Sequence, residues 1–264
     1  MEYPETIRAG LVQFDVRKGD IQANRIKAFD AIARLADDGA TLAVLPELWS
    51  CGFDPVRMTA HAEKTPEIVE ALRFLAKKHR MLIAGSLPEL SGKHIYNTLF
   101  VADRGGSIAG TYRKIHLFKF HQEEKTFAPG DRAVVCATSI GPIGLMICYD
   151  LRFPELCRTL AVAGARMVLV CAQWPESRIH QWDALLSARA IENQIFIAAC
   201  NRVGTDGELT FTGHSRILSP DGATLAVIKD QAGEATARID FSEIDLIRRH
   251  YDTLAERVPS AYRI

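Results

Sequence analysis

The chain has no excess of charge of either sign. Its 32 lysines and arginines are matched by 32 aspartates and glutamates, so the formal net charge of its 264 residues is zero. A nucleic-acid-binding protein usually carries a basic patch, and a peripheral membrane protein usually carries a polybasic surface. The charge balance therefore argues against a nucleic acid or a membrane as a partner.

Long apolar runs and a secretory leader are also lacking. No apolar segment approaches the roughly 18 residues that a membrane-spanning helix requires. The amino terminus reads MEYPETIR and has no basic stretch followed by an apolar run, which would mark a secretory signal. We therefore expect a cytoplasmic protein.

Metal-binding and redox motifs are absent as well. The six cysteines form no Cys-x-x-Cys pair, so structural zinc and thioredoxin-like chemistry have little support, and reduced thiols are expected. His116 and His121 have no carboxylate or cysteine at a spacing that would complete a metal site, and we expect them in a solvated loop. Neither a metal nor an organic cofactor is expected.

The apolar residues alternate between strand-like and helix-like spacing. Gly39 should close the first helix, and Thr65 followed by Pro66 predicts an N-cap and a first helical residue. Asp103 to Gly106 predicts a hairpin turn. The expected strands are 7–16, 41–45, 81–85, 96–102, 107–112, 134–138, 143–148, 167–172 and 195–200. The expected helices are 20–38, 65–79, 154–163, 180–193 and a short one near 242–249.

This order predicts an α/β protein in which helices cover mixed sheets. The antiparallel hairpins in the middle of the chain distinguish it from a TIM barrel. No linker, repeat or low-complexity segment interrupts the pattern, so we expect one domain over residues 1–264.

Three polar residues lie at or just beyond the ends of predicted strands. Cys148 ends an apolar run and precedes a polar turn and the helix that Pro154 opens. Sites in α/β folds gather at this edge, and the positive end of a helix dipole favours a thiolate. Taken alone, Cys148 could equally be a residue that packs in the apolar core. Glu47 could be a helix cap or a solvated carboxylate, and Lys114 could be a solvated cation.

Together these three residues resemble the nitrilase, or carbon–nitrogen hydrolase, superfamily. The resemblance rests on Pro46-Glu47-Leu-Trp49, Tyr112-Arg-Lys114 and Cys148-Tyr-Asp-Leu-Arg-Phe-Pro154, which occur in the family's order. It implies a four-layer αββα sandwich and a Glu-Lys-Cys catalytic set. Glu47 then corresponds to the general base, Lys114 to the oxyanion cation and Cys148 to the nucleophile. Glu123 corresponds to an additional glutamate that positions the substrate.

These residue types suit amide hydrolysis, because an amide carbonyl is a poor electrophile that needs an activated nucleophile. Cys148 would attack the carbonyl while Lys114 and the backbone N–H of Tyr149 stabilise the oxyanion. Glu47 would pass the thiol proton to the leaving ammonia and then activate water against a thioester. A carboxylate suits both tasks best when burial raises its pKa towards neutrality.

The second half resembles the omega-amidase branch, which removes the terminal amide of 2-oxoglutaramate and 2-oxosuccinamate. The matching motifs are Gln173-Trp-Pro175, Ala188-Arg-Ala-Ile-Glu-Asn-Gln194 and Cys200-Asn-Arg-Val-Gly204. We therefore expect Trp174 among the substrate-binding residues and an arginine at the substrate carboxylate. Arg178 is the first candidate, with Arg152 and Arg202 as rivals.

Alternative functions remain open at this point. The chain could be another amidase of the superfamily that acts on an N-carbamoyl compound or a deaminated-peptide amide. It could also be a non-catalytic binding module. The resemblance further implies a homodimer or higher homo-oligomer. The apolar tail Val258–Ile264 could contact a neighbouring subunit, or it could equally pack on its own subunit.

Overall fold

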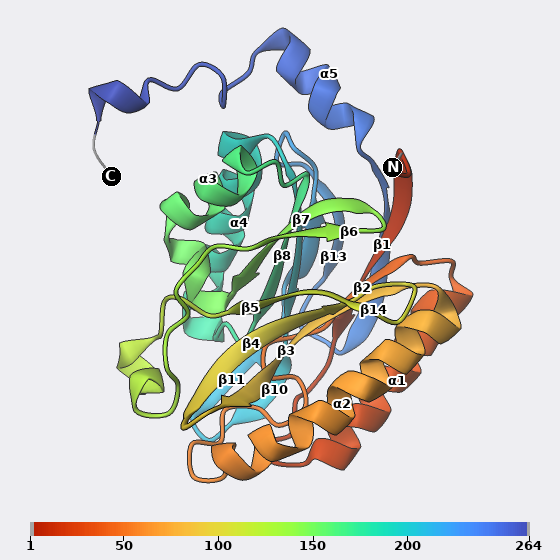
Figure 1. The fold of residues 1–264 in the computed structure, drawn as a ribbon, viewed down its shortest axis with the longest axis vertical. Helices are drawn as coiled ribbons and strands as arrows, with labels where there is room; N and C mark the ends of the chain where they lie inside the picture. The colour runs from red at the N-terminus through yellow and green to blue at the C-terminus, as the bar shows by residue number, and fades with distance from the viewer. Residues whose placement is uncertain (1–2, 263–264) are drawn as a thin grey trace.

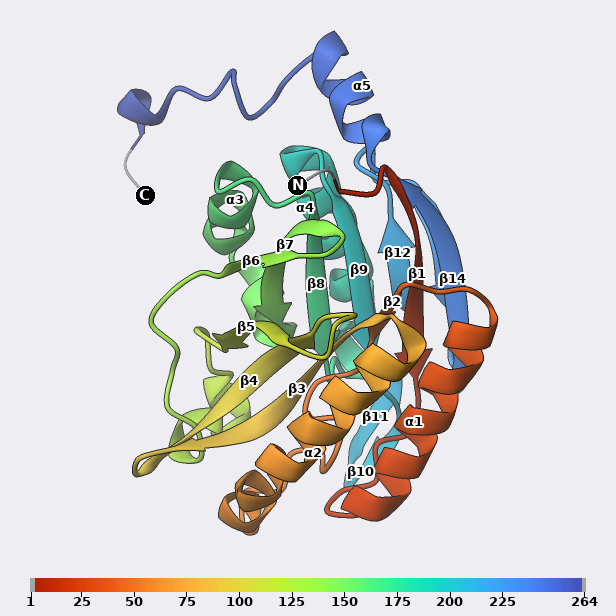
Figure 2. The ribbon, with the colours of Figure 1, turned by 45° about the vertical axis from the view of Figure 1, so that its right-hand side comes forward.

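The computed structural model describes residues 3–262, which form two six-stranded sheets packed face to face with helices outside them (Figures 1 and 2). The first sheet has the order β14 (Gly233–Asp240), β1 (Thr6–Gln13), β2 (Leu42–Val44), β3 (Leu82–Ser91), β4 (His94–Ala102), β5 (Ile108–Arg113). The second has the order β13 (Thr224–Ile228), β12 (Ser215–Leu218), β9 (Phe196–Asn201), β8 (Met167–Ala172), β7 (Gly141–Ile147), β6 (Val135–Thr138). A separate hairpin joins β10 (Val203–Asp206) to β11 (Leu209–Thr212).

Helices cover the outer faces of both sheets. In both views α1 (Ile21–Asp37) and α2 (Met58–His79) lie side by side on the first sheet (Figures 1 and 2). The helices α3 (Pro154–Val162) and α4 (Ile179–Asn193) pack against the second sheet, and their apolar residues join the core that both sheets share. The predicted four-layer αββα sandwich is confirmed.

Buried apolar strands and two glycines explain why the layers pack closely. The central parallel strands are apolar on both faces, as strands buried on both sides must be. A Cβ on Gly144 of β7 would lie 3.0 Å from the Cβ of Leu160, so glycine at this position lets α3 approach the strand. A Cβ on Gly10 of β1 would lie 2.8 Å from Cδ1 of Leu35, so glycine at this position lets α1 approach the first sheet.

The direction of the strands brings the ends of both sheets to a common edge. In the first sheet β1, β2 and β3 are parallel, and two antiparallel steps through β4 give β5 the same direction. In the second sheet β7, β8 and β9 are parallel. Glu47 follows β2, Lys114 follows β5 and Cys148 follows β7. All three therefore leave carboxyl ends of strands, as the sequence predicted.

Two sequence predictions need correction. The second helix begins at Met58, not at Thr65, and Pro66 lies inside it. Met58 and Ala62 are both buried, so apolar contacts extend the helix about two turns beyond the predicted start. The Thr65 hydroxyl donates to the Pro88 carbonyl instead of capping the helix. In addition, β3 continues to Ser91 and forms a long hairpin with β4.

The carboxyl-terminal segment extends past the ends of α3 and α4. Figures 1 and 2 show α5 (Ser242–His250) and the residues after it on this side of the molecule. Gln194 donates to the Tyr251 carbonyl at 2.8 Å, which fixes the start of the tail on its own chain. Val258 is exposed, and residues 263–264 of the predicted contact segment lie outside the described residues. Oligomerisation stays a prediction.

Candidate active site

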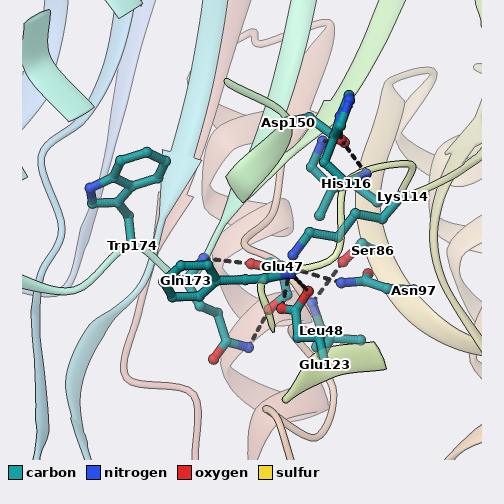
Figure 3. Close-up of polar contacts among 12 residues, drawn as sticks. Glu47, Leu48, Ser86, Asn97, Lys114, His116, Glu123, Asp150, Gln173 and Trp174 are labelled. Carbon is teal, nitrogen blue, oxygen red and sulfur yellow. Dashed lines mark hydrogen bonds and ion pairs between the residues drawn. The ribbon is translucent and has the colours of Figure 1, made fainter. Parts of the chain in front are cut away.

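Lys114 joins two carboxylates in a buried cluster. Its Nζ donates to Glu47 Oε1 at 2.8 Å and to Glu123 Oε1 at 2.9 Å (Figure 3). Glu47 and Lys114 are 2% and 1% exposed, so neither is the solvated surface residue that each could have been from the sequence alone. The structure therefore brings together the predicted base, cation and additional glutamate.

Glu47 is held by both sheets. Asn97 of β4 donates from Nδ2 to Glu47 Oε1 at 2.8 Å, and the backbone N–H of Gln173 donates to Oε2 at 2.9 Å (Figure 3). The Gln173 side chain also donates to the Glu47 carbonyl at 2.8 Å. Leu48 has a positive φ of 43°, and its N–H donates to Ser86 Oγ at 2.8 Å. These contacts fix the carboxylate in one orientation.

The charges of the cluster shift its pKa values. Burial alone would lower the pKa of Lys114, but Glu123 and Glu47 outweigh it and raise that pKa well above its usual range. Burial raises the pKa of Glu123, and the negative charge of Glu47 adds to this, while Lys114 opposes it. Lys114 is therefore a permanent cation that can stabilise negative charge but cannot act as a base.

Cys148 is the first residue of the 3₁₀ helix η3 (Cys148–Arg152) and has a positive φ of 47°. It lines the same cavity as Glu47 and Glu123. Burial raises the pKa of its thiol well above the usual range, Glu47 adds to the increase, and Lys114 opposes it. The helix dipole is too weak to offset burial beside a carboxylate, so Cys148 rests as a thiol that needs a base.

The cavity over Cys148 has an empty volume of about 690 Å³ up to its open mouth. About half of the residues in its wall are aromatic or apolar, namely Leu48, Phe53, Phe118, Tyr149, Trp174, Pro175, Leu209 and Phe211. The β10–β11 hairpin supplies part of this wall through Leu209. Such a cavity suits a small substrate held by apolar contacts and a few polar groups.

The three candidate arginines have different surroundings. Arg178, on η4 (Glu176–Arg178), lines the cavity with its guanidinium carbon 5.5 Å from the centre of the Phe118 ring. Arg152 also lines the cavity, 4.7 Å from the Trp174 ring centre. Arg202 is completely buried and pairs with Asp15 at 3.2 Å, so it is a structural ion-pair residue.

Trp174 and Tyr149 both lie at the cavity over Cys148. Trp174 lines the cavity, its backbone N–H donates to Asn201 Oδ1 at 2.7 Å, and its indole N–H donates to the Arg178 carbonyl at 2.8 Å. The last bond ties the tryptophan to the segment that carries Arg178. Tyr149 also lines the cavity and is the second residue of η3. Its N–H is therefore one of the amino-terminal groups that a helix leaves without an internal partner.

Several residues of the site were missed or misread from the sequence. Asn97 was read only as part of a strand, and a buried amide within a strand could have signalled its role. His116 and His121 lie in the partly exposed connection between β5 and β6, but each also has a contact that the sequence did not reveal, since His116 bonds to Asp150 at 2.8 Å and His121 lines the cavity.

The described residues contain neither a candidate metal site nor a candidate membrane-spanning helix. Among residues 3–262, no group of three or more histidine, cysteine, aspartate or glutamate side chains could hold a metal ion. Within the same range, no helix has the length and apolar composition needed to cross a bilayer.

The family model described as carbon–nitrogen hydrolase matches residues 8–249. The chain belongs to this family. This carbon–nitrogen hydrolase is therefore an enzyme, and the cluster around Cys148 lies within the matched range.

Individual relatives support the same assignment. The 2-oxoglutaramate amidase of Bacillus subtilis (strain 168) is 36% identical over 239 residues, which cover 90% of this chain and 92% of that protein. The omega-amidase NIT2 of Mus musculus is 30% identical, with 98% of each chain covered. A solved variant of the amidase from Nesterenkonia sp. AN1 has a TM-score of 0.87 at 30% identity, with 97% of this chain and 98% of that chain covered. That structure shows the result of Michael addition of acrylamide at the active-site cysteine of the Nesterenkonia amidase.

Proposed function

We propose that this enzyme is a thiol-dependent amidase that hydrolyses the terminal amide of a small carboxylate-bearing substrate, 2-oxoglutaramate or 2-oxosuccinamate. The observation that carries the proposal is the buried Glu47–Lys114–Glu123 cluster beside Cys148, in a cavity that also has two arginines in its wall. The names of the Bacillus and mouse relatives support the substrate class.

The first half of the reaction forms a thioester. The Cys148 sulfur attacks the amide carbonyl as its proton passes to Glu47, whose carboxylate is already oriented by Asn97 and Gln173. The carbonyl oxygen becomes an oxyanion that Lys114 and the Tyr149 N–H stabilise. Glu47 then returns the proton to the leaving nitrogen, the carbon–nitrogen bond breaks and ammonia departs.

The second half releases the acid. Glu47 takes a proton from a water molecule that attacks the thioester carbonyl, and a second oxyanion forms at the same donors. This intermediate collapses, the carbon–sulfur bond breaks, and the Cys148 sulfur recovers the proton from Glu47. The permanent charge of Lys114 suits both oxyanions, because no proton has to arrive or leave during the cycle.

Recognition of the substrate carboxylate falls to Arg178. Its guanidinium lies over the rings of Phe118 and Phe120 at 5.5 and 5.2 Å, at the wall of the cavity. Arg152 is the rival, but its guanidinium donates to Gln181 Oε1 at 2.6 Å and so has a partner already. A charge-assisted bond to a carboxylate is stronger than a neutral one, so Arg178 would select acidic amides.

The substrate proposal can be tested by measuring ammonia release from a panel of amides. The panel contains 2-oxoglutaramate, 2-oxosuccinamate, an N-carbamoyl amino acid, a deaminated-peptide amide and the uncharged propionamide. We expect the highest kcat/KM for the first two. A clear preference for the N-carbamoyl compound or the peptide amide would favour the other superfamily amidases, and no ammonia from any amide would contradict the proposed activity.

We also propose that the enzyme is located in the cytoplasm. All six cysteines are free thiols in the structure, which fits a reducing compartment such as the cytoplasm.

A further inference from the structure

Asp150, two residues after the nucleophile, has a completely buried carboxylate that accepts hydrogen bonds at both oxygens. Oδ2 accepts from the Tyr112 hydroxyl at 2.8 Å and from the Ile147 N–H at 3.0 Å. Oδ1 accepts from the His116 N–H at 3.0 Å and from His116 Nδ1 at 2.8 Å. A carboxylate accepts only, so Nδ1 of His116 carries a proton.

The donors come from the two segments that carry the catalytic groups. Ile147 directly precedes Cys148, whereas Tyr112 and His116 flank Lys114 by two residues on either side. Figure 3 shows Asp150 and His116 next to the chain that leads to Lys114. One carboxylate therefore connects the turn of the nucleophile to the segment of the oxyanion cation.

Asp150 also stabilises the turn at Cys148, whose backbone has an unfavourable conformation. Cys148 has a φ of 47°, a region that costs a residue other than glycine roughly 1–2 kcal/mol. The Ile147 N–H bond to Asp150 spans this residue and closes the turn. On the other side, the His116 ring stacks on Phe153, with 3.6 Å between centroids and 8° between planes.

We propose that Asp150 is a positioning residue that sets the Cys148 sulfur against the Lys114 ammonium, acting through Ile147, Tyr112 and His116. This inference rests on the proposed function of Cys148 and Lys114. Asp150 itself does not touch the substrate, since its carboxylate is enclosed and does not line the cavity. Only a group with acceptors at both ends can serve all four donors.

The first test is Asp150→Asn, which keeps the shape but turns one end of the group into a donor. We expect kcat on the best amide of the panel to fall about a hundredfold, the effect of a roughly 1 Å misplacement of reacting groups. KM should change less than about threefold, because the cavity wall is unchanged. A kcat within about threefold of wild type would overturn the proposal, whatever happens to the melting temperature.

The matched control is Asp103→Asn. This partly buried aspartate accepts from the N–H and the hydroxyl of Ser139, at the opposite end of β5 from Lys114. The variant should lower thermal stability while kcat stays as in wild type. An equal loss of kcat in this control would show that stability alone explains the Asp150 result and would contradict a positioning role.

A second pair of variants applies even if Asp150→Asn does not fold. His116→Asn can still place an N–H near the position of Nδ1, whereas His116→Ala cannot. We expect alanine to lower kcat about tenfold and asparagine to restore most of it. Equal activity of the two variants would overturn the proposal.

The same pair can be compared without any substrate, through the rate at which acrylamide alkylates Cys148. Since Lys114 favours the thiolate, a misplaced sulfur in His116→Ala should react more slowly than in wild type or His116→Asn. Identical alkylation rates in all three proteins would contradict the role of Asp150. Loss of activity towards every amide with the alkylation difference intact would instead contradict the proposed function.

Discussion

Lys114 Nζ lies 2.8 Å from Glu47 Oε1, and both side chains are buried at the common edge of two sheets. A second carboxylate contacts the same ammonium, because Glu123 Oε1 lies 2.9 Å from Lys114 Nζ. Two carboxylates thus face one ammonium next to the Cys148 thiol. Burial raises the pKa of the Cys148 thiol well above its usual range, and the negative charge of Glu47 adds to the increase.

The first prediction concerns the pH dependence of Cys148 alkylation. Because burial and then Glu47 raise the pKa of the thiol, the alkylation rate of the free enzyme should still rise with pH at pH 9. Glu47→Gln removes a negative charge and leaves Lys114, so the thiol pKa should fall and the pH midpoint of alkylation should move down. The measurement is the rate of acrylamide labelling against pH, read by mass spectrometry.

The same Glu47→Gln variant should release ammonia at least about a hundredfold more slowly than wild type, because the general base is lost. Faster labelling with slower turnover separates the charge of Glu47 from its role in proton transfer. A midpoint that moves up, or stays in place, would contradict the assigned electrostatics.

The second prediction concerns Asn97, which donates to Glu47 Oε1 at 2.8 Å. Asn97→Ala removes a bond that orients the base and should lower kcat about tenfold. Loss of a buried partner should also cost about 1–3 kcal/mol of stability. Steady-state kinetics and thermal unfolding measure the two effects, and an unchanged kcat in a folded variant would show that Lys114 and Gln173 alone orient Glu47.

The third prediction concerns Arg178. Arg178→Ala should raise KM for 2-oxoglutaramate by about ten- to a hundredfold, since a hydrogen bond to a charged group contributes about 1.5–3 kcal/mol. Hydrolysis of propionamide should be unchanged, because this amide has no carboxylate. If Arg152→Ala and not Arg178→Ala gives this pattern, the carboxylate is bound at the other arginine.

The fourth prediction concerns the contact between β7 and α3. A Cβ at Gly144 would lie 2.9 Å from Val168 Cγ2 and 3.0 Å from Leu160 Cβ, so Gly144→Ala should cost about 1–3 kcal/mol in overpacking. Gly105 has no atom within 4 Å of the corresponding position, so Gly105→Ala is the matched control and should leave the melting temperature nearly unchanged. Equal melting temperatures would mean that the helix shifts at little cost.

Much of the fold was predictable because it depends on local patterns. Strand 167–172 and the helix that Pro154 opens were predicted at or near their observed bounds, since apolar runs and proline at a first helical turn are strong signals. The start of α2 was not, because the packing of Met58 and Ala62 against distant residues decides it. The Thr65-Pro66 capping motif is visible in the sequence, but the packing that extends the helix to Met58 is not.

The residues of the candidate site also fall into two groups, those that local sequence motifs reveal and those whose roles depend on contacts in the folded protein. Glu47, Lys114 and Cys148 could be proposed from the sequence because each lies in a short motif in the family's order, and Glu123 could be proposed as the additional glutamate of the same family. Asn97 and the partners of Asp150 could not, since their roles come from bonds between segments far apart in the chain. The raised pKa of the Cys148 thiol could not be predicted, because the helix dipole is visible in the local sequence, whereas burial and the nearness of Glu47 are properties of the folded protein.

The central claim is that the Cys148 sulfur attacks the amide carbonyl, and ammonia release from 2-oxoglutaramate by wild type, Cys148→Ser and Cys148→Ala tests it most directly. Circular dichroism and thermal unfolding establish that the variants keep the fold. The account predicts that both folded variants lose ammonia release down to the background of the assay. Substantial activity in the folded alanine variant would contradict it.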